Sequence, residues 1–122
     1  MGIKDRQTLE RHPLRGLIFE NFVLMDLVKQ EWSRGTKPSL YFFRDSIGNE
    51  VDILHEQNGM YAPIEVKSSE TFNEDFVKGI FAFQKILAGT EFEKQLLPGT
   101  VICNVKQRFS FKGVSVSSPF EV

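Results

Sequence analysis

Apolar residues recur at helical spacing in two segments of the chain, which we expect to form helices. The first runs from about Leu14 to Ser33, where Pro13 suits the first turn and Gly35 lies just past the end. Glu20 lies within the apolar side of this helix, where a carboxylate is seldom tolerated without a partner. The second runs from about Asn73 to Leu87. One face of this second helix carries an apolar stripe, which predicts that the face packs in the core. The stripe consists of Phe72, Phe76, Ile80, Phe83 and Leu87.

Alternating apolar and polar residues predict strands between and after these helices. Turns at Gly48-Asn49 and Asn58-Gly59 separate the first three strands. The order is therefore helix, three strands, helix, strand, which predicts an α/β fold with a central mixed sheet of four to five strands flanked by helices. We expect residues 1–122 to form one domain. The strands are expected at about Leu40–Arg44, Glu50–His55, Met60–Lys67, Thr100–Asn104 and Gly113–Ser117.

Composition limits the functions that the chain can have. Its 122 residues suffice for one core, and twelve phenylalanines predict that this core is aromatic. The net charge of −1 excludes a global basic field, so any phosphate-binding surface must be local. Cys103 has no disulfide partner and is expected to be buried. Neither a signal peptide nor a membrane span is evident, which favours a cytoplasmic protein with no membrane partner. Cationic residues group at Lys4, Arg6, Arg11 and Arg15 and at Lys106, Arg108 and Lys112, where solvated surface is the simpler interpretation.

Candidate chemistry lies in the second and third predicted strands. Asp52 belongs to one, while Glu65 and Lys67 end the next. Because side chains alternate in a strand, Glu65 and Lys67 should point to one side, while Ile64 and Val66 point into a core. Two carboxylates and an ammonium group suit a hard divalent cation together with a phosphate. A salt-bridged cluster on an exposed sheet face is the alternative.

Four segments together resemble a known superfamily. They are Phe19–Val23, Tyr41–Asp45, Glu50–Leu54 and Ile64–Ser69. Their order resembles the αβββαβ core of the PD-(D/E)XK, or restriction-endonuclease-like, superfamily. Over about residues 14–105 the chain is most similar to the domain of unknown function at the C-terminal end of many bacterial and archaeal AAA-type ATPases. This resemblance implies that the chain is the C-terminal part of a longer ATPase, because the sequence contains no P-loop motif of its own.

The resemblance also implies roles for single residues. Asp52 and Glu65 match the acids that ligate the metal directly, and Val66 would add its backbone carbonyl. Glu20 matches a helix acid that some members add to the metal shell. Lys67 matches the lysine that orients or deprotonates the attacking water. The implied catalytic set is Glu20, Asp52, Glu65 and Lys67, and the implied cofactor is Mg²⁺ or Mn²⁺.

Other residues match the superfamily less well. Val51 stands where the proline that names the motif is found in other members. Gln84 corresponds to a glutamine of some exonuclease-like members, although a solvent-facing helical residue is the simpler interpretation. Arg44 and Asp45 are expected to take part in a structural ion pair rather than in a phosphate clamp. Neither histidine has the spacing of a metal ligand.

Two functions remain open at this point. The first is a Mg²⁺-dependent nuclease, a hydrolase of phosphodiester bonds, that cuts nucleic acid delivered by its ATPase, with DNA favoured over RNA. The second is a catalytically inactive, nuclease-like docking or assembly module of that ATPase. The four matching residues favour the nuclease, whereas the lack of a broad basic surface favours the docking module.

Overall fold

The computed structural model describes residues 15–35 and 39–119, which fall into two compact units. The first unit contains α2 (Arg15–Ser33), whose bounds confirm the first predicted helix. Gly35, just past its end, has a φ of 76°, the left-handed conformation that favours glycine after a helix. Pro13, Leu14 and the cationic residues Lys4, Arg6 and Arg11 lie outside the described residues, as does His12.

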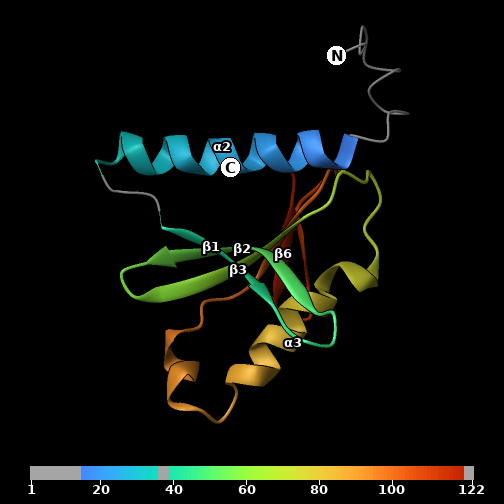
Figure 1. The fold of residues 1–122 in the computed structure, drawn as a ribbon. Coiled ribbons are helices and arrows are strands. Elements are labelled where there is room, and N and C mark those ends of the chain that lie inside the picture. Colours follow the sequence, from blue (N-terminus) through green and yellow to red (C-terminus); the bar gives the residue numbers. More distant parts are fainter. Residues whose placement is uncertain (1–14, 36–38, 120–122) are drawn as a thin grey trace, which may run out of the picture. The chain divides into compact units, whose positions relative to one another are not determined.

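The second unit begins at Ser39 and, in its described part, contains a six-stranded mixed sheet with the order β1-β2-β3-β4-β6-β5 (Figure 1). This confirms the α/β class. Strands β1, β2 and β3 pair antiparallel, β3, β4 and β6 run parallel, and β5 returns antiparallel to β6. The strands are β1 (Leu40–Arg44), β2 (Glu50–Gln57), β3 (Met60–Val66), β4 (Thr100–Ile102), β5 (Phe109–Phe111) and β6 (Val114–Ser117).

The sheet has one strand more than the sequence pattern predicted. Strand β5 was missed because it has only three residues, too few to show an alternation, and two of them are exposed. It forms a hairpin with β6 across Lys112 and Gly113, which have φ values of 48° and 84°. Asn58 and Gly59, between β2 and β3, likewise have positive φ values of 55° and 80°. That pair confirms the turn predicted there.

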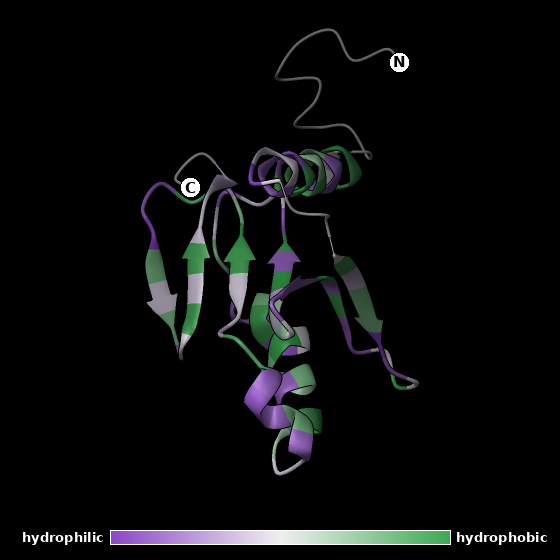
Figure 2. Cartoon of the chain, turned by 90° about the vertical axis from the view of Figure 1, so that its left-hand side faces the viewer, coloured by the Kyte–Doolittle hydropathy of each residue, from purple (hydrophilic) through white to green (hydrophobic). Residues whose placement is uncertain are grey.

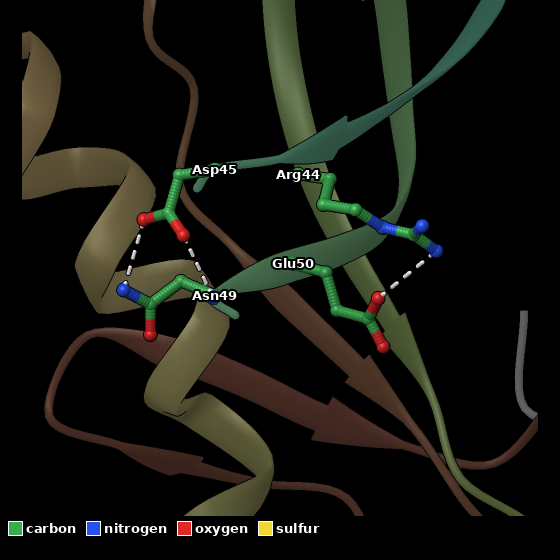
Figure 3. A network of polar contacts seen from close by, with 4 residues as sticks. All are labelled: Arg44, Asp45, Asn49 and Glu50. Carbon is green, nitrogen blue, oxygen red and sulfur yellow. Dashed lines mark hydrogen bonds and ion pairs between the residues drawn. The ribbon is translucent and has the colours of Figure 1, made fainter. Parts of the chain in front are cut away.

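The turn between β1 and β2 is held by side chains (Figure 3). The Asp45 carboxylate accepts hydrogen bonds from the backbone N–H groups of Ile47 and Asn49 and from the Asn49 side chain. Arg44 forms its ion pair with Glu50, at 3.5 Å, and not with Asp45. The reason is geometric, since Arg44 and Glu50 are opposite each other in the ladder, whereas the Asp45 carboxylate turns into the loop. Arg44 thus takes part in an ion pair as expected, whereas Asp45 holds the turn through hydrogen bonds instead.

The second predicted helix begins as a 3₁₀ turn, η1 (Glu74–Val77), and continues as α3 (Lys78–Leu87). Asn73 caps it, because its side chain accepts a hydrogen bond from the N–H of Asp75 at 2.8 Å. The apolar stripe is confirmed as core: Ile80 is fully buried against the sheet, and Phe83 packs in a neighbouring cluster. Figure 2 shows the largely hydrophobic central strands and α3 beside them. Cys103 is buried there, as expected. A further 3₁₀ helix, η2 (Glu91–Gln95), was not predicted.

Gly79 allows α3 to lie directly on the sheet. A methyl group at this position would collide with the backbone carbonyl oxygen of Glu50 and lie 3.1 Å from Oε1 of Glu65. We expect Gly79→Ala to lower the free energy of unfolding by about 2–4 kcal/mol, because the backbone cannot yield as a flexible side chain would. Urea denaturation measures this. The matched control is Lys78→Ala at the exposed neighbouring position, which should change stability by less than about 0.5 kcal/mol. Equal stability of the two variants would contradict the close approach.

Candidate metal and phosphate site

Asp52 lies where the ladder between β2 and β3 ends. The ladder ends with the pair Ile53 and Ile64, so Asp52 and Glu65 come next, opposite each other. The Asp52 Oδ2 accepts a hydrogen bond from the backbone N–H of Val66 at 2.9 Å. In a continued ladder, the N–H of Val66 would donate to a backbone carbonyl of β2. Here it donates to the Asp52 carboxylate instead, and this hydrogen bond holds the carboxylate between the two strands.

A bulge in β2 coincides with Asp52. On β1 only Phe42 separates Tyr41 from Phe43, but their partners Leu54 and Val51 are separated by two residues. These two residues are Asp52 and Ile53, so β2 has one residue more than β1 at this point. Such an extra residue bends a strand and redirects its side chains, a device that often occurs beside functional sites.

Glu65 is a buried carboxylate, with 4% of its surface exposed. It stands beside Val101 of β4 on the face covered by α3, where its Oε1 approaches Gly79. Among the described residues, Oε1 has no hydrogen-bond partner. The expectation that only Ile64 and Val66 would be buried was therefore incomplete. Ile64, Glu65 and Val66 are all buried, since β3 is an interior strand of the sheet and α3 covers the face that carries Glu65.

Lys67 follows β3 and lies at the surface beside this carboxylate. Its Nζ is 3.7 Å from Oε2 of Glu65, and its side chain is 40% exposed, against 5% for that of Glu65. The ammonium group also lies 5.9 Å from the centre of the Phe76 ring. The backbone N–H of Lys67 donates to the carbonyl of Ile102, which continues the pairing of β3 with β4. A buried acid and a surface cation therefore form one polar site.

The surroundings of Glu65 favour its neutral form. Burial raises the pKa of Glu65 most, followed by the negative charge of Asp52 and a side-chain hydrogen bond between the two carboxyl groups, and the result is a pKa of about 8. The Lys67 ammonium lowers the pKa but only partly offsets these effects. In the metal-free protein at neutral pH, Glu65 thus keeps its proton.

A family model described as a domain of unknown function, DUF4143, matches residues 15–120, almost the whole chain. The chain belongs to the DUF4143 family. This membership confirms the part of the resemblance that pointed to a domain of unknown function. A search of curated proteins found no match. Across residues 15–35 and 39–119, no helix of this DUF4143 domain is long and apolar enough to cross a membrane.

The DUF4143 domain brings together three of the four predicted catalytic residues, namely Asp52, Glu65 and Lys67. They gather at the end of the two strands, not at the lateral edge of the sheet, because β2 and β3 are interior strands. Glu20 is on α2, in the other unit, and its part in the site stays a prediction. The same holds for the carbonyl of Val66.

His55 and Gln84 lie in partly or fully buried positions of the fold. His55 is buried, with Nδ1 3.0 Å from the side-chain nitrogen of Gln57, and Gln84 is partly buried on α3 rather than facing solvent. Within the described ranges, no group of three or more His, Cys, Asp or Glu residues is placed to hold a metal. Sequence reasoning missed Gly79, although a glycine inside an apolar helical stripe is a signal of close approach.

Proposed function

We propose that this domain is a metal-dependent phosphodiesterase of the PD-(D/E)XK nuclease type, which acts on nucleic acid, with DNA favoured, and works attached to an AAA-type ATPase. One observation carries the proposal. The buried carboxyl group of Glu65 lies against Asp52 and 3.7 Å from the Lys67 ammonium, and its Oε1 has no hydrogen-bond partner among the described residues. Such a pair of acids is costly to keep without a bound cation.

The donor set fits a hard divalent cation. Mg²⁺ is commonly bound through one or two carboxylates, and water and substrate phosphate complete its shell. Asp52 and Glu65 supply two carboxylates, and the Val66 carbonyl is the proposed third protein ligand. The thiol of Cys103, the one cysteine in the sequence, is buried in the apolar core and is not offered to this site as a soft ligand. Mg²⁺ or Mn²⁺ is therefore the proposed cofactor.

Each residue of the site has a distinct part in the proposed reaction. When bound, the cation would supply Lewis-acid activation of a water molecule and neutralise charge on the scissile phosphate. The N–H of Val66 holds the Asp52 carboxylate in a fixed orientation. Lys67, which is partly exposed beside Glu65, can donate hydrogen bonds to the attacking water or to a phosphate oxygen. Glu65 lies beneath them and excludes bulk water from one side of the site.

The test combines metal binding with cleavage. We expect wild-type protein to bind Mn²⁺ in calorimetry and to cleave DNA or RNA, single- or double-stranded, with Mg²⁺ or Mn²⁺. Asp52→Asn should weaken Mn²⁺ binding by at least about tenfold, because it removes a charged ligand. It should cost little stability, since asparagine can still accept the hydrogen bond from the backbone N–H of Val66. The matched control is Asp75→Asn on exposed η1, which should bind Mn²⁺ as wild type does. No Mn²⁺ binding by wild type at millimolar concentration would refute the proposal.

A docking or assembly role is the second proposed function, and the surface of α2 favours it. Leu17, Met25 and Trp32 are 57%, 52% and 68% exposed. They are seven or eight residues apart, so they follow one stripe of the helix. Exposed apolar stripes of this kind are typical of surfaces that bind another protein. Absence of both metal binding and cleavage, together with binding to the ATPase portion through α2, would favour this role.

A further inference from the structure

The segment after β4 differs in charge from the rest of the chain. Residues 104–119 contain Lys106, Arg108 and Lys112 but no aspartate or glutamate, although the chain as a whole has a net charge of −1. All three cationic side chains are exposed. This segment is therefore locally positive in a protein without a global positive charge.

The first part of this segment lies at the same end of the sheet as the metal and phosphate site. Strands β3 and β4 are parallel, so the residues that follow them emerge side by side. Asn104 fixes this arrangement, because its backbone N–H donates to the carbonyl of Ser69 at 2.9 Å and its side chain to that of Ser68 at 3.3 Å. Lys106 and Arg108 follow directly and lead into Phe109, which pairs with Val116 at the carboxyl end of β6.

Aromatic rings connect the two places. The Lys67 ammonium lies over Phe76, whose ring contacts Phe72 with the ring centres 5.9 Å apart. Phe72 in turn contacts Phe109 edge to face, at 5.3 Å. Phe109 is 40% exposed, so part of its ring is open to solvent next to Arg108. A continuous run of three aromatic rings thus leads from the Lys67 ammonium to Phe109, the residue that follows Arg108 in the chain.

We propose that Lys106, Arg108 and Phe109 form a binding surface for an unpaired nucleic-acid strand that continues from the metal and phosphate site. This inference rests on the proposed function and names the form of its substrate. Lys106 and Arg108 contact phosphates, and the open part of the Phe109 ring stacks on a base. Grooves for single strands combine these two elements, positive charge along the backbone and aromatic rings for the bases. Exposed rings give little to a duplex, whose bases are already stacked.

Binding is measured without catalysis, by fluorescence anisotropy of labelled oligothymidylate in EDTA at several NaCl concentrations. We expect the double variant Lys106→Ala/Arg108→Ala to bind roughly tenfold or more weakly than wild type. The slope of log affinity against log salt should flatten by about 1.4, which corresponds to two lost phosphate contacts on a single strand. Lys85→Ala/Lys94→Ala is the matched control, with the same charge change at exposed positions on α3 and η2. An equal loss in the control would overturn the proposal.

A second variant tests the stacking part. Phe109→Leu keeps an apolar contact with Phe72 but removes the aromatic face, and should weaken oligothymidylate binding about tenfold with an unchanged salt slope. Duplex DNA bound as tightly as the single strand, or poly-glutamate that competes as well as oligothymidylate, would overturn the proposal. Because EDTA removes metal, strand binding without Mn²⁺ binding would support the surface while refuting the phosphodiesterase. Conversely, cleavage by wild type, together with unaltered strand binding by both variants, would support the phosphodiesterase and refute the binding surface.

Discussion

Replacement of Glu65 by glutamine is expected to stabilise the metal-free protein at pH 8.5 and to abolish most of its Mn²⁺ binding. Glutamine can still donate a hydrogen bond to the Asp52 carboxylate, as protonated Glu65 does, but it cannot ionise. The stabilisation arises because the pKa of Glu65 is raised in the folded protein from its ordinary value of 4.5 to about 8. Converted by linkage, this shift corresponds to on the order of 3–5 kcal/mol.

The sign of this effect depends on pH. Below about pH 4.5 Glu65 is protonated in both the folded and the unfolded chain, so it contributes nothing. Between about pH 4.5 and pH 8 the unfolded chain releases the proton while the folded protein keeps it, so stability falls as pH rises. Above about pH 8 the cost is constant. We therefore expect wild type and Glu65→Gln to be about equally stable at pH 4.5 and to differ most at pH 8.5.

Urea denaturation in EDTA across this pH range measures the difference between the two proteins. Glu70→Gln, at an exposed position in the loop after β3, is the matched control and should follow wild type. In calorimetry, the affinity of wild type for Mn²⁺ should rise about tenfold for each pH unit between about 6 and 8, because the metal displaces one proton. The same stability profile for wild type and Glu65→Gln would show that the carboxyl group is not held neutral.

Substitution of Lys67 is expected to separate catalysis from metal binding. Lys67→Ala should reduce phosphodiester cleavage at least about 100-fold, the usual cost of losing one donor that stabilises transition-state charge. Mn²⁺ affinity should remain largely intact because an ammonium group is not a metal ligand. Stability should change by less than about 1 kcal/mol, since the Lys67 side chain is 40% exposed and its polar contact with Glu65 is 3.7 Å long.

Two companion variants make this test sharper. Lys67→Met keeps an aliphatic side chain of similar length beside Phe76 and should lose as much activity as the alanine variant, which separates the charge from the packing. Lys78→Ala removes an exposed lysine from α3 and should cleave as wild type does. Wild-type cleavage that survives Lys67→Ala unchanged would indicate a contaminating nuclease. Loss of Mn²⁺ binding in Lys67→Met would show instead that the lysine supports the metal site itself.

The amino-acid pattern alone was sufficient for most of the local structure. The apolar stripe from Phe72 to Leu87 predicted a core helix, and Asn58-Gly59 predicted a hairpin turn. Both are properties of short segments, set by side-chain spacing and by the conformations that asparagine and glycine tolerate. The juxtaposition of Asp52, Glu65 and Lys67 could also be predicted, because neighbouring antiparallel strands and a two-residue turn fix the register.

Only the tertiary structure decided the environment of that site. Alternation gives the side of the sheet to which Glu65 points, but not that α3 covers this side or that Gly79 allows the approach. The hydrogen bond from the N–H of Val66 to Asp52 depends on how β2 and β3 separate at the end of their ladder. The bulge at Asp52 depends on how β1 pairs with β2. Both involve residues distant in sequence, and the same is true of Asn104, which ties the segment that leads to Lys106 and Arg108 to the loop after β3. The sequence by itself thus determined which groups meet, whereas burial, and with it the raised pKa of Glu65, arose from packing between elements.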